Sequence, residues 1–495
     1  MGYFNELPAL GREISPSLLL IGAASLIPMI IGCIYQEWTV IPWMALATIS
    51  LCGVGLILKF LPGKKGVKPR VGLSIAGTAL IWVVVGIFGS FPFLYTGMPF
   101  IDCAFESMSA WTGTGFSIAP NIEEWPNTLL FWRSFMQWIG GLGIIAFALT
   151  VASRSGLIKR GLYRSEGRSE AFMPSVIATA FQMWKIYFVL TAIAIIAILL
   201  TGVGLWDAIN LALCAIATGG MTIYSDGIAH FGNFALEMVL IPIMIAGAIP
   251  FRLYYLTYVN RSPREILRDK VLHLMLGVFI FVSAVLILQL VFSSGLPLID
   301  AVREALFMTG SAVSSTGFQN TAMLGWGASS IIFLSVFILI GGAQGSTSGG
   351  IKLERIQVMF EALVWWFKKT LLSPKACLTM KHNGKPIKGE DAEELISRSL
   401  LLILFFILMI VLIIVILLCD PYFSSNVVGT IFDVCSCVGN NGATAGLISA
   451  AMPDYSKILL FIVMWIARLE VIPVMILLWG IFRGFGWEPV TKTRR

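Results

Sequence analysis

The sequence has little charge, and this shortage excludes most soluble folds. Only 12% of its 495 residues are charged, whereas 57% are hydrophobic, and the mean hydropathy is +0.87. A soluble globular protein carries charge on about a quarter of its residues. Because unpaired backbone groups are not tolerated in lipid, such a chain spans the membrane as helices. We therefore predict an all-α polytopic membrane protein.

The residues of common active sites are also scarce. Only three histidines occur, and none belongs to an HExxH pair or to an Asp-rich metal site. The eight cysteines lie mostly in apolar surroundings, where a free thiol behaves as a small hydrophobe. Cys435 and Cys437 have no accompanying histidine or second cysteine pair, so packing is favoured over metal or redox chemistry. An enzyme, including an intramembrane hydrolase, has little support, and no organic cofactor is expected.

Long apolar stretches are what the sequence does contain. A bilayer core about 30 Å thick requires roughly 20 apolar residues per helix. Ten such stretches lie near residues 16–36, 40–61, 71–95, 128–152, 182–204, 234–258, 271–294, 328–366, 396–419 and 456–482. No clear small-residue cleavage site follows the first stretch, so we interpret it as a retained helix.

Basic residues follow alternate stretches and predict the topology. Examples are Lys64, Arg154, Arg261, Lys368 and Arg483, whereas the opposite loops are mainly acidic. By the positive-inside rule the basic loops and both termini are cytoplasmic, which places the protein in the cytoplasmic (inner) membrane. The net charge of +7 is explained by this topology, and since no long basic cluster occurs, nucleic acid is not an expected partner.

Four short runs of glycine and small polar residues lie on the predicted outer side. They occupy residues 112–117, 217–222, 314–319 and 439–444, about 100 residues apart. Each follows a short segment that is predicted to be a re-entrant half-helix, at 101–111, 206–217, 299–314 and 428–438. Non-helical backbone at membrane depth is tolerated where it lines an aqueous path. The alternative for any single run is an ordinary turn at the end of an outer loop.

The runs divide the chain into four pseudo-symmetric modules of helix, pore loop and helix. Two N-terminal helices (1–70) precede module 1 (71–160), module 2 (161–262), module 3 (263–385) and module 4 (386–495). In three modules we expect intact spanning helices with only the connectors broken. A secondary transporter has its discontinuities in the spanning helices themselves, so this pattern favours a channel-like pore.

The third module is the expected exception, because glycines interrupt its second helix. They lie in the run Gly341, Gly342, Ala343, Gln344, Gly345, Ser346, Thr347, Ser348, Gly349 and Gly350. Glycine costs about 1 kcal/mol relative to alanine within a helix, so the helix should break here. A nucleotide-binding loop requires Gly-Lys-Ser or Gly-Lys-Thr, but here Gly350 precedes Ile351. A flexible plug below the filter fits this place, and a simple helix break is the alternative.

Charged residues inside the last stretch are functional candidates, because an ionisable group in a span is costly. Arg468 could line the pore as a fixed positive charge, or it could hold a backbone carbonyl or carboxylate. Glu470 is near enough in sequence to offset Arg468, although helix positions two apart face each other poorly. Arg133 and Arg252 lie near the ends of their stretches, where we expect them to snorkel towards the interface.

These runs, the interrupted eighth stretch and the segment 465–470 together resemble the Trk/Ktr/HKT superfamily of cation transport subunits. The two N-terminal helices make the chain most similar to its TrkH-like members, and the segment 137–143 is another specific motif. The resemblance covers essentially the whole chain. It implies a single-chain potassium pore, a homodimer, and a cytoplasmic nucleotide-binding, TrkA-like regulatory subunit.

Matching the motifs also implies the site. The filter positions are Thr114, Gly115, Phe116, Thr218, Gly219, Gly220, Ser315, Thr316, Gly317, Asn440, Asn441 and Gly442. The implied contacts to the transported K⁺ ion fall on Thr114, Gly115, Thr218, Gly219, Thr316, Gly317, Asn441 and Gly442. By the same match residues 341–350 correspond to an intramembrane gating loop, and Arg468 to an arginine that projects towards the conduction path.

The expected function is therefore gated monovalent cation uptake, most simply of potassium. Outer acidic residues would concentrate cations, and rings of backbone carbonyls would replace their water shell. The chain departs from the family pattern at Met221, where an aromatic residue is usual, and around Gly442, where the alignment is loose. A sodium-permeable member of the same family and an alternating-access transporter are the alternatives.

Overall fold

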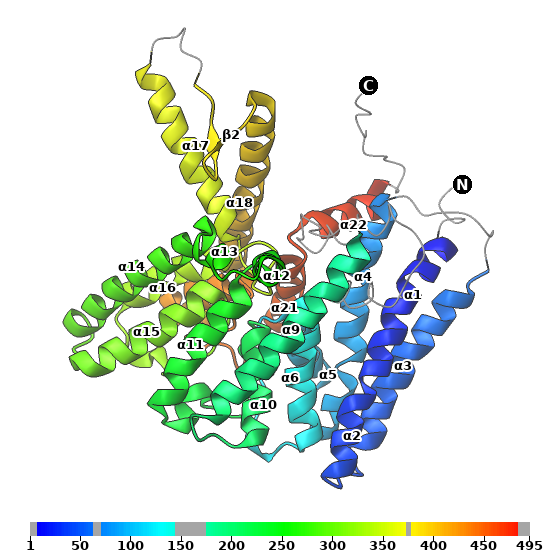
Figure 1. Ribbon diagram of the computed structural model, residues 1–495. Helices are drawn as coiled ribbons and strands as arrows, with labels where there is room; N and C mark the ends of the chain where they lie inside the picture. Colours follow the sequence, from blue (N-terminus) through cyan, green and yellow to red (C-terminus); the bar gives the residue numbers. More distant parts are fainter. Residues whose placement is uncertain (1–6, 63–70, 144–174, 373–377, 484–495) are drawn as a thin grey trace.

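The computed structural model describes residues 7–62, 71–143, 175–372 and 378–483 (Figure 1). The end of the fourth apolar stretch, Cys377 and several predicted cytoplasmic basic residues, Lys64 and Arg154 among them, lie outside these residues. The described chain is helical apart from one short antiparallel hairpin. In it β1 (Lys381–His382) pairs with β2 (Lys385–Pro386), with Lys381 opposite Pro386. The all-α prediction is confirmed.

Three helices precede a fourfold repeat. They are α1 (Leu7–Ala24), α2 (Leu26–Ile34) and α3 (Ile41–Phe60). Each repeat begins with a long helix, and these are α4 (Val71–Phe88), α9 (Val176–Leu199), α14 (Lys270–Phe292) and α18 (Gly389–Leu418). A short helix follows each, namely α5 (Phe100–Thr112), α10 (Leu205–Ile216), α15 (Leu298–Ser314) and α20 (Val427–Val438). The four short helices occur where the sequence predicts them.

Each repeat ends with a second helix or helix pair. These are α6 (Asn127–Leu142), α11 (Phe234–Ala248) with α12 (Phe251–Asn260), α16 (Ala328–Ile340) with α17 (Leu353–Leu371), and α21 (Asp454–Arg468) with α22 (Ile472–Arg483). The connections carry α13 (Arg264–Leu267), α19 (Pro421–Ser424), η2 (Phe91–Thr96), η3 (Ile122–Glu124), η4 (Gly227–Phe231) and η5 (Met323–Gly325).

The repeats pack in a ring. Each short helix contacts the second helix of the preceding repeat, so that α10 packs on α6, α15 on α11, α20 on α16, and α5 returns to α21. The three N-terminal helices pack outside this ring, against α4, α6 and η2. The four short helices are therefore held between repeats, and the segments that follow them are brought together.

The expectation of intact second helices in three modules is wrong. The pair α11 and α12 bends by 90°, and α21 and α22 bend by 113°. The first bend falls at Pro250, which lacks an N–H group and keeps Ile249 extended. The second falls at Glu470 and Val471, whose φ angles are +54° and +70°. In every repeat whose second helix is fully described, that helix is broken.

The bends also reduce the number of uninterrupted spans below the ten expected. Within the described ranges six helices are long and apolar enough to cross a membrane, and eight if each bent pair counts as one. The start of α1 and the end of α22 lie on the same side as the α17–β1–β2–α18 hairpin, which projects from the body of the protein (Figure 1). The arrangement is that of a multi-pass membrane protein.

Candidate selectivity filter and gating loop

Four glycines, one in each run, have backbone angles that side-chain-bearing residues rarely adopt. Their φ angles are +90° at Gly115, +75° at Gly220, +91° at Gly317 and +93° at Gly442. Two positions before each, φ is also positive, at +67° for Gly113, +50° for Thr218, +56° for Ser315 and +46° for Asn440. Glycine is required where such angles occur outside the left-handed helical region. The four runs therefore share one backbone conformation despite their different letters.

These four glycines lie against one another's runs in a closed ring. A Cβ atom added at each glycine would lie too close to a carbonyl oxygen of the next run. The distances are 2.0 Å from a Cβ atom on Gly115 to the Gly219 oxygen, 2.2 Å from Gly220 to Thr316, 1.7 Å from Gly317 to Asn441, and 2.1 Å from Gly442 to Thr114. Each of these carbonyls belongs to the residue just before a glycine of the set. We call these eight residues the filter ring, and no side chain larger than hydrogen fits at its four glycines.

The ends of the short helices hold the filter ring in place. Backbone N–H groups of the ring donate to carbonyls of the preceding helix: Thr114 to Ser109 (3.0 Å), Gly219 to Cys214 (2.9 Å), Thr316 to Ser311 (2.9 Å) and Asn441 to Ser436 (2.9 Å). The hydroxyls of Ser311 and Ser436 also accept from the N–H groups of Gly317 (2.9 Å) and Gly442 (3.0 Å). The same helix-end bonding thus recurs in all four repeats.

Side chains tie neighbouring runs together. The Asn440 amide donates to Thr114 Oγ1 (2.7 Å), and the Ser315 hydroxyl donates to the Gly439 carbonyl (2.8 Å). Phe116 is buried. Among the described residues Asn440 Oδ1 has no hydrogen-bond donor although it is buried. It is therefore a free oxygen next to the filter ring.

One ring carbonyl is already engaged by the first residue of the 137–143 motif, to which the sequence analysis assigned no role at the site. The Gln137 amide donates to the Gly219 carbonyl (2.6 Å), and Gln137 Oε1 accepts from the Met221 N–H group (3.2 Å). Gln137 is buried in α6. It fixes the direction of the Gly219 carbonyl and leaves that oxygen one lone pair for another partner.

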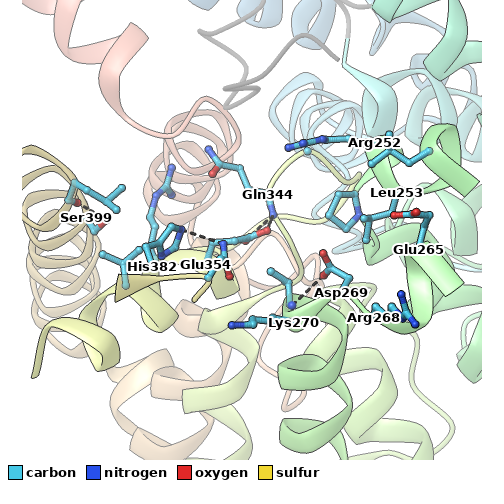
Figure 2. Close-up of a pocket in the computed structure, with 18 of the residues that line it drawn as sticks. Arg252, Leu253, Glu265, Arg268, Asp269, Lys270, Gln344, Glu354, His382 and Ser399 are labelled. Atoms are coloured by element: carbon cyan, nitrogen blue, oxygen red, sulfur yellow. Dashed lines mark hydrogen bonds between the residues drawn. The ribbon is translucent and has the colours of Figure 1, made fainter. Parts of the chain in front are cut away.

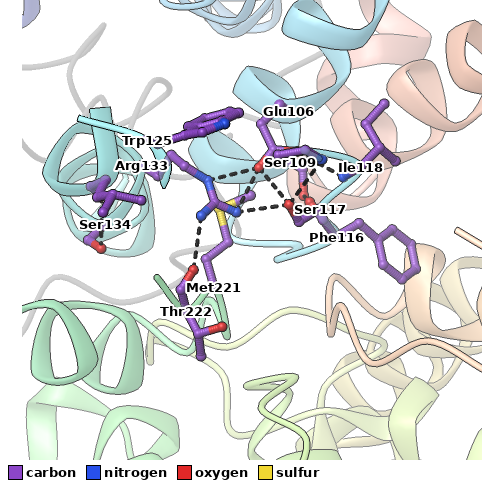
Figure 3. Close-up of polar contacts among 12 residues, drawn as sticks. Glu106, Ser109, Phe116, Ser117, Ile118, Trp125, Arg133, Ser134, Met221 and Thr222 are labelled. Carbon is purple, nitrogen blue, oxygen red and sulfur yellow. Dashed lines mark hydrogen bonds and ion pairs between the residues drawn. The ribbon is translucent and has the colours of Figure 1, made fainter. Parts of the chain in front are cut away.

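The expectation that Arg133 snorkels is wrong, because Arg133 is only 1% exposed and pairs with Glu106 (Figure 3). Its Nε atom donates to Glu106 Oε1 (2.8 Å), and its Nη1 atom donates to the carbonyl of Thr222 in the second run (2.9 Å). Glu106 also accepts from the hydroxyl of Ser117 (2.9 Å). This buried pair therefore braces the first run against the second.

Similar braces occur at the other repeats and were not foreseen. Glu237 of α11 accepts from Arg303 of α15 (2.6 and 2.8 Å) and from Asn320 (3.1 Å). Lys457 of α21 pairs with Asp102 of α5 (2.6 Å). Asp433 accepts from the N–H group of Ala445 (2.6 Å) and the Thr444 hydroxyl (3.1 Å). The carboxylates were visible in the sequence, but the partners of Glu237 and Asp102 lie in other repeats, and only those of Asp433 lie in its own.

The buried carboxylates change the expected role of the outer acidic residues. Asp102, Glu106 and Asp433 are each under 5% exposed and hold the loops, so they do not form a solvated acidic mouth. Glu123 is an exposed exception, and it accepts from the Ser225 N–H group (2.6 Å) and hydroxyl (2.9 Å). The Ser225 backbone bond, together with its hydroxyl, holds the pKa of Glu123 below its ordinary range.

Residues 341–350, the candidate gating loop and called the gating loop below, leave the helical path between α16 and α17 and pack against the filter runs. The Thr347 hydroxyl contacts the Ile216 carbonyl (3.0 Å), the Gly247 carbonyl (2.9 Å) and Thr218 Oγ1 (3.1 Å). A Cβ atom added to Gly349 would lie 2.6 Å from the Gly439 carbonyl and from the Asn440 Cβ atom. The loop thus touches the ends of two short helices and two filter runs.

Arg468 lies between this loop and the first repeat. Its guanidinium donates to the carbonyls of Thr347 (3.0 Å), Gly140 (2.6 Å) and Gly141 (2.8 Å). These bonds match the alternative in which the arginine holds backbone carbonyls. The carboxylate of Glu470 forms an ion pair with Arg355 of α17.

Two cavities lie around the gating loop. A cavity of about 30 Å³, bordered by Trp82, Thr347 and Arg468, is large enough for roughly one water molecule. A cavity of about 770 Å³ lies on the side of the loop towards α12, α17 and α18, and Gln344 and Glu354 are among its lining residues (Figure 2). The gating loop thus lines the larger cavity with Gln344 and contacts the filter runs with Thr347 and Gly349.

Comparisons with known proteins agree with this architecture. The family TrkH, described as "Cation transport protein", matches residues 45–481. An uncharacterized cation transporter of Methanocaldococcus jannaschii is 33% identical over 92% of both chains. The Trk system potassium uptake protein TrkG of Escherichia coli is 26% identical over 93% of this chain and 94% of its own.

A solved structure extends the likeness to three dimensions. The crystal structure of the potassium transporter TrkH from Vibrio parahaemolyticus has a TM-score of 0.83 and 25% identity, with 98% of this chain and all of that chain covered. The chain belongs to the TrkH family of cation transport proteins.

Proposed function

We propose that the protein is a potassium uptake subunit whose filter ring conducts the ion. The observation that carries this proposal is the closed cycle of contacts, in which each ring glycine lies against a carbonyl of the next run. Rings of backbone carbonyls replace the water shell of K⁺ in channel filters. Several relatives, including TrkG and the TrkH proteins, are named as potassium uptake proteins.

The gating loop is proposed to close this path on the cytoplasmic side. Its contacts with Thr218 and Gly439, and the small cavity beside Arg468, support an occluded arrangement. Glycines at 341, 345 and 350 with positive φ allow the loop to change its backbone path. Arg468 acts here as a tether of the loop to the first repeat, and its charge would also discourage tight cation occupancy below the ring.

The setting of the pore is proposed from the same pattern. Basic residues around α12, α13 and α17 support a cytoplasmic position for that side and for both termini, and we propose that the membrane is the cytoplasmic one. The family resemblance further implies a homodimer and a nucleotide-binding regulatory subunit on that side. The relatives' names, which describe components of a Trk system, are consistent with such assistance.

Alternating access is the competing function, and the broken second helices remove one argument against it. The filter ring is the observation that favours a channel, because a continuous ring needs no rocking of one half against the other. Electrical recording separates the two. Currents that never exceed about a thousand ions per second, the scale of enzyme turnover, would favour alternating access.

The proposal is tested in cells that lack potassium uptake, by measuring growth and rubidium entry. The intact chain should restore both, and Gly115→Ser should abolish both, because the ring leaves no room for a side chain at Gly115. Competition by sodium in the same assay distinguishes a potassium filter from a sodium-permeable one. Unchanged rubidium entry in Gly115→Ser would exclude the filter ring as the path.

A further inference from the structure

The tip of the gating loop is held by a carboxylate that the proposed function leaves without a role. Glu354, in the first turn of α17, accepts the N–H group of Gln344 on both carboxylate oxygens (2.8 and 2.7 Å). Figure 2 shows this bond inside the larger cavity, with His382 close by. A hydrogen bond to an ionised acceptor is roughly twice as strong as a neutral one, so Glu354 is well suited to fix the tip.

Arg355, the residue next to Glu354, contacts the bend between α21 and α22. Arg355 donates to the Ile351 carbonyl (2.8 Å) and pairs with Glu470 at the bend between α21 and α22. The first turn of α17 thus contacts both the gating loop and the bend of the fourth repeat. A shift of α17 along its axis would strain both contacts together.

The far part of α17 is joined to the projecting hairpin. Trp365 Nε1 donates to the Leu378 carbonyl (2.9 Å), and Glu361 contacts His382 of β1 (2.7 Å). Val358, Ala362, Met380 and Ala392 form a small separate hydrophobic cluster there. The hairpin and α17 are therefore packed together, and Glu354 connects them to the loop.

We propose that Glu354 is a positioning residue that latches the tip of the gating loop in its occluded position and so keeps the pore closed. The inference rests on the proposed function, because it presumes that the loop closes the filter path. Glu354 touches neither the ion nor the filter ring, so it sets how often the pore opens and leaves the conducted ion unchanged.

The test uses the full-length chain in lipid bilayers without any regulatory subunit. Glu354→Ala should raise the frequency of opening and rubidium entry about fivefold or more, with the current of each opening and the ion preference unchanged. Glu354→Gln keeps one acceptor without the charge and should lie between the two. Glu393→Gln removes the charge of an exposed acid on α18, away from the first turn of α17. It is the matched charge control and should behave as the intact chain.

Two further measurements separate the latch from the filter. The amount of protein extracted from the membrane and its thermal unfolding must match the intact chain in at least one Glu354 variant. Combining Glu354→Ala with Gly115→Ser should abolish the raised flux. If Glu354→Ala and Glu354→Gln open as rarely as the intact chain, the latch is overturned but the filter proposal is unaffected. If the flux stays raised when Gly115→Ser is added to Glu354→Ala, the filter proposal is overturned.

Discussion

Replacing Gly317 by alanine is the sharpest perturbation of the filter ring. The added Cβ atom would lie 1.7 Å from the Asn441 carbonyl oxygen, whereas real Cβ atoms are essentially never closer than 3.0 Å to such an atom. The atoms that this Cβ atom would meet belong to the backbone of Asn441 and Gly442, so no side-chain rotation relieves the contact. The third and fourth runs must therefore move apart by more than about 1 Å, which displaces the Asn441 carbonyl from its ring position.

The backbone angle adds a second cost. A φ angle of +91° in a residue with a side chain costs about 1–3 kcal/mol. Since 1.4 kcal/mol corresponds to a factor of ten, this strain alone reduces the population of the native ring by roughly 5- to 150-fold. The steric contact adds to that figure, so we expect potassium or rubidium flux to fall at least fivefold and the preference over sodium to decline.

Reconstituted vesicles give the measurement, as initial rubidium uptake at several potassium and sodium concentrations. Gly53→Ala and Gly277→Ala are the matched controls, because both glycines are helical and a Cβ atom there meets nothing within 4 Å. They should keep full flux and be stabilised by up to about 1 kcal/mol. Normal flux and selectivity in a folded Gly317→Ala protein would refute the ring geometry.

Three other perturbations follow from the braces. Glu106→Gln leaves Arg133 buried without its charge partner and should lower the free energy of unfolding by about 3–5 kcal/mol, which thermal unfolding measures. Adding Arg133→Met to Glu106→Gln should recover part of the lost stability. An unchanged unfolding midpoint in Glu106→Gln alone would contradict the brace. Arg468→Ala removes three hydrogen bonds to backbone carbonyls, each worth about 1.5–3 kcal/mol because the donor is charged. Rubidium flux should therefore rise without a change in ion selectivity. A lowered flux would contradict the role of Arg468 as a tether of the gating loop. Folding lowers the pKa of Glu123, so the stability that Glu123 contributes is complete above its unfolded-state pKa and is lost as the pH falls through its folded-state pKa. Acid should therefore lower the unfolding temperature less in Glu123→Gln than in the intact chain. Equal losses in the two proteins would exclude this contact.

Local sequence was enough to locate the four short helices and the glycine runs that follow them. A run of apolar residues followed by glycine specifies a helix that stops, and all four short helices begin and end within about a residue or two of the predicted limits. The glycines chosen as anchors, Gly115, Gly220, Gly317 and Gly442, are those with positive φ. Backbone conformation at glycine is a local property, so the sequence carries it.

Contacts between distant segments were beyond the reach of local patterns. Arg133 looked like a residue at the end of a span, and only packing reveals that Glu106 and Thr222 surround it. The bends at Pro250 and Glu470 were missed because continuous hydrophobicity masks a break in direction. Pro250 was the available signal, since a proline inside an apolar stretch bends a helix.

The sequence by itself determined a helical membrane protein with four equivalent glycine runs and one interrupted helix, because hydrophobicity and glycine act within a few residues of the chain. Only the tertiary structure decided that the runs close into one ring, that buried carboxylates brace them, and that Glu354 holds the loop. The reason is physical: a ring, an ion pair or a latch is made by groups whose distance in space is set by packing.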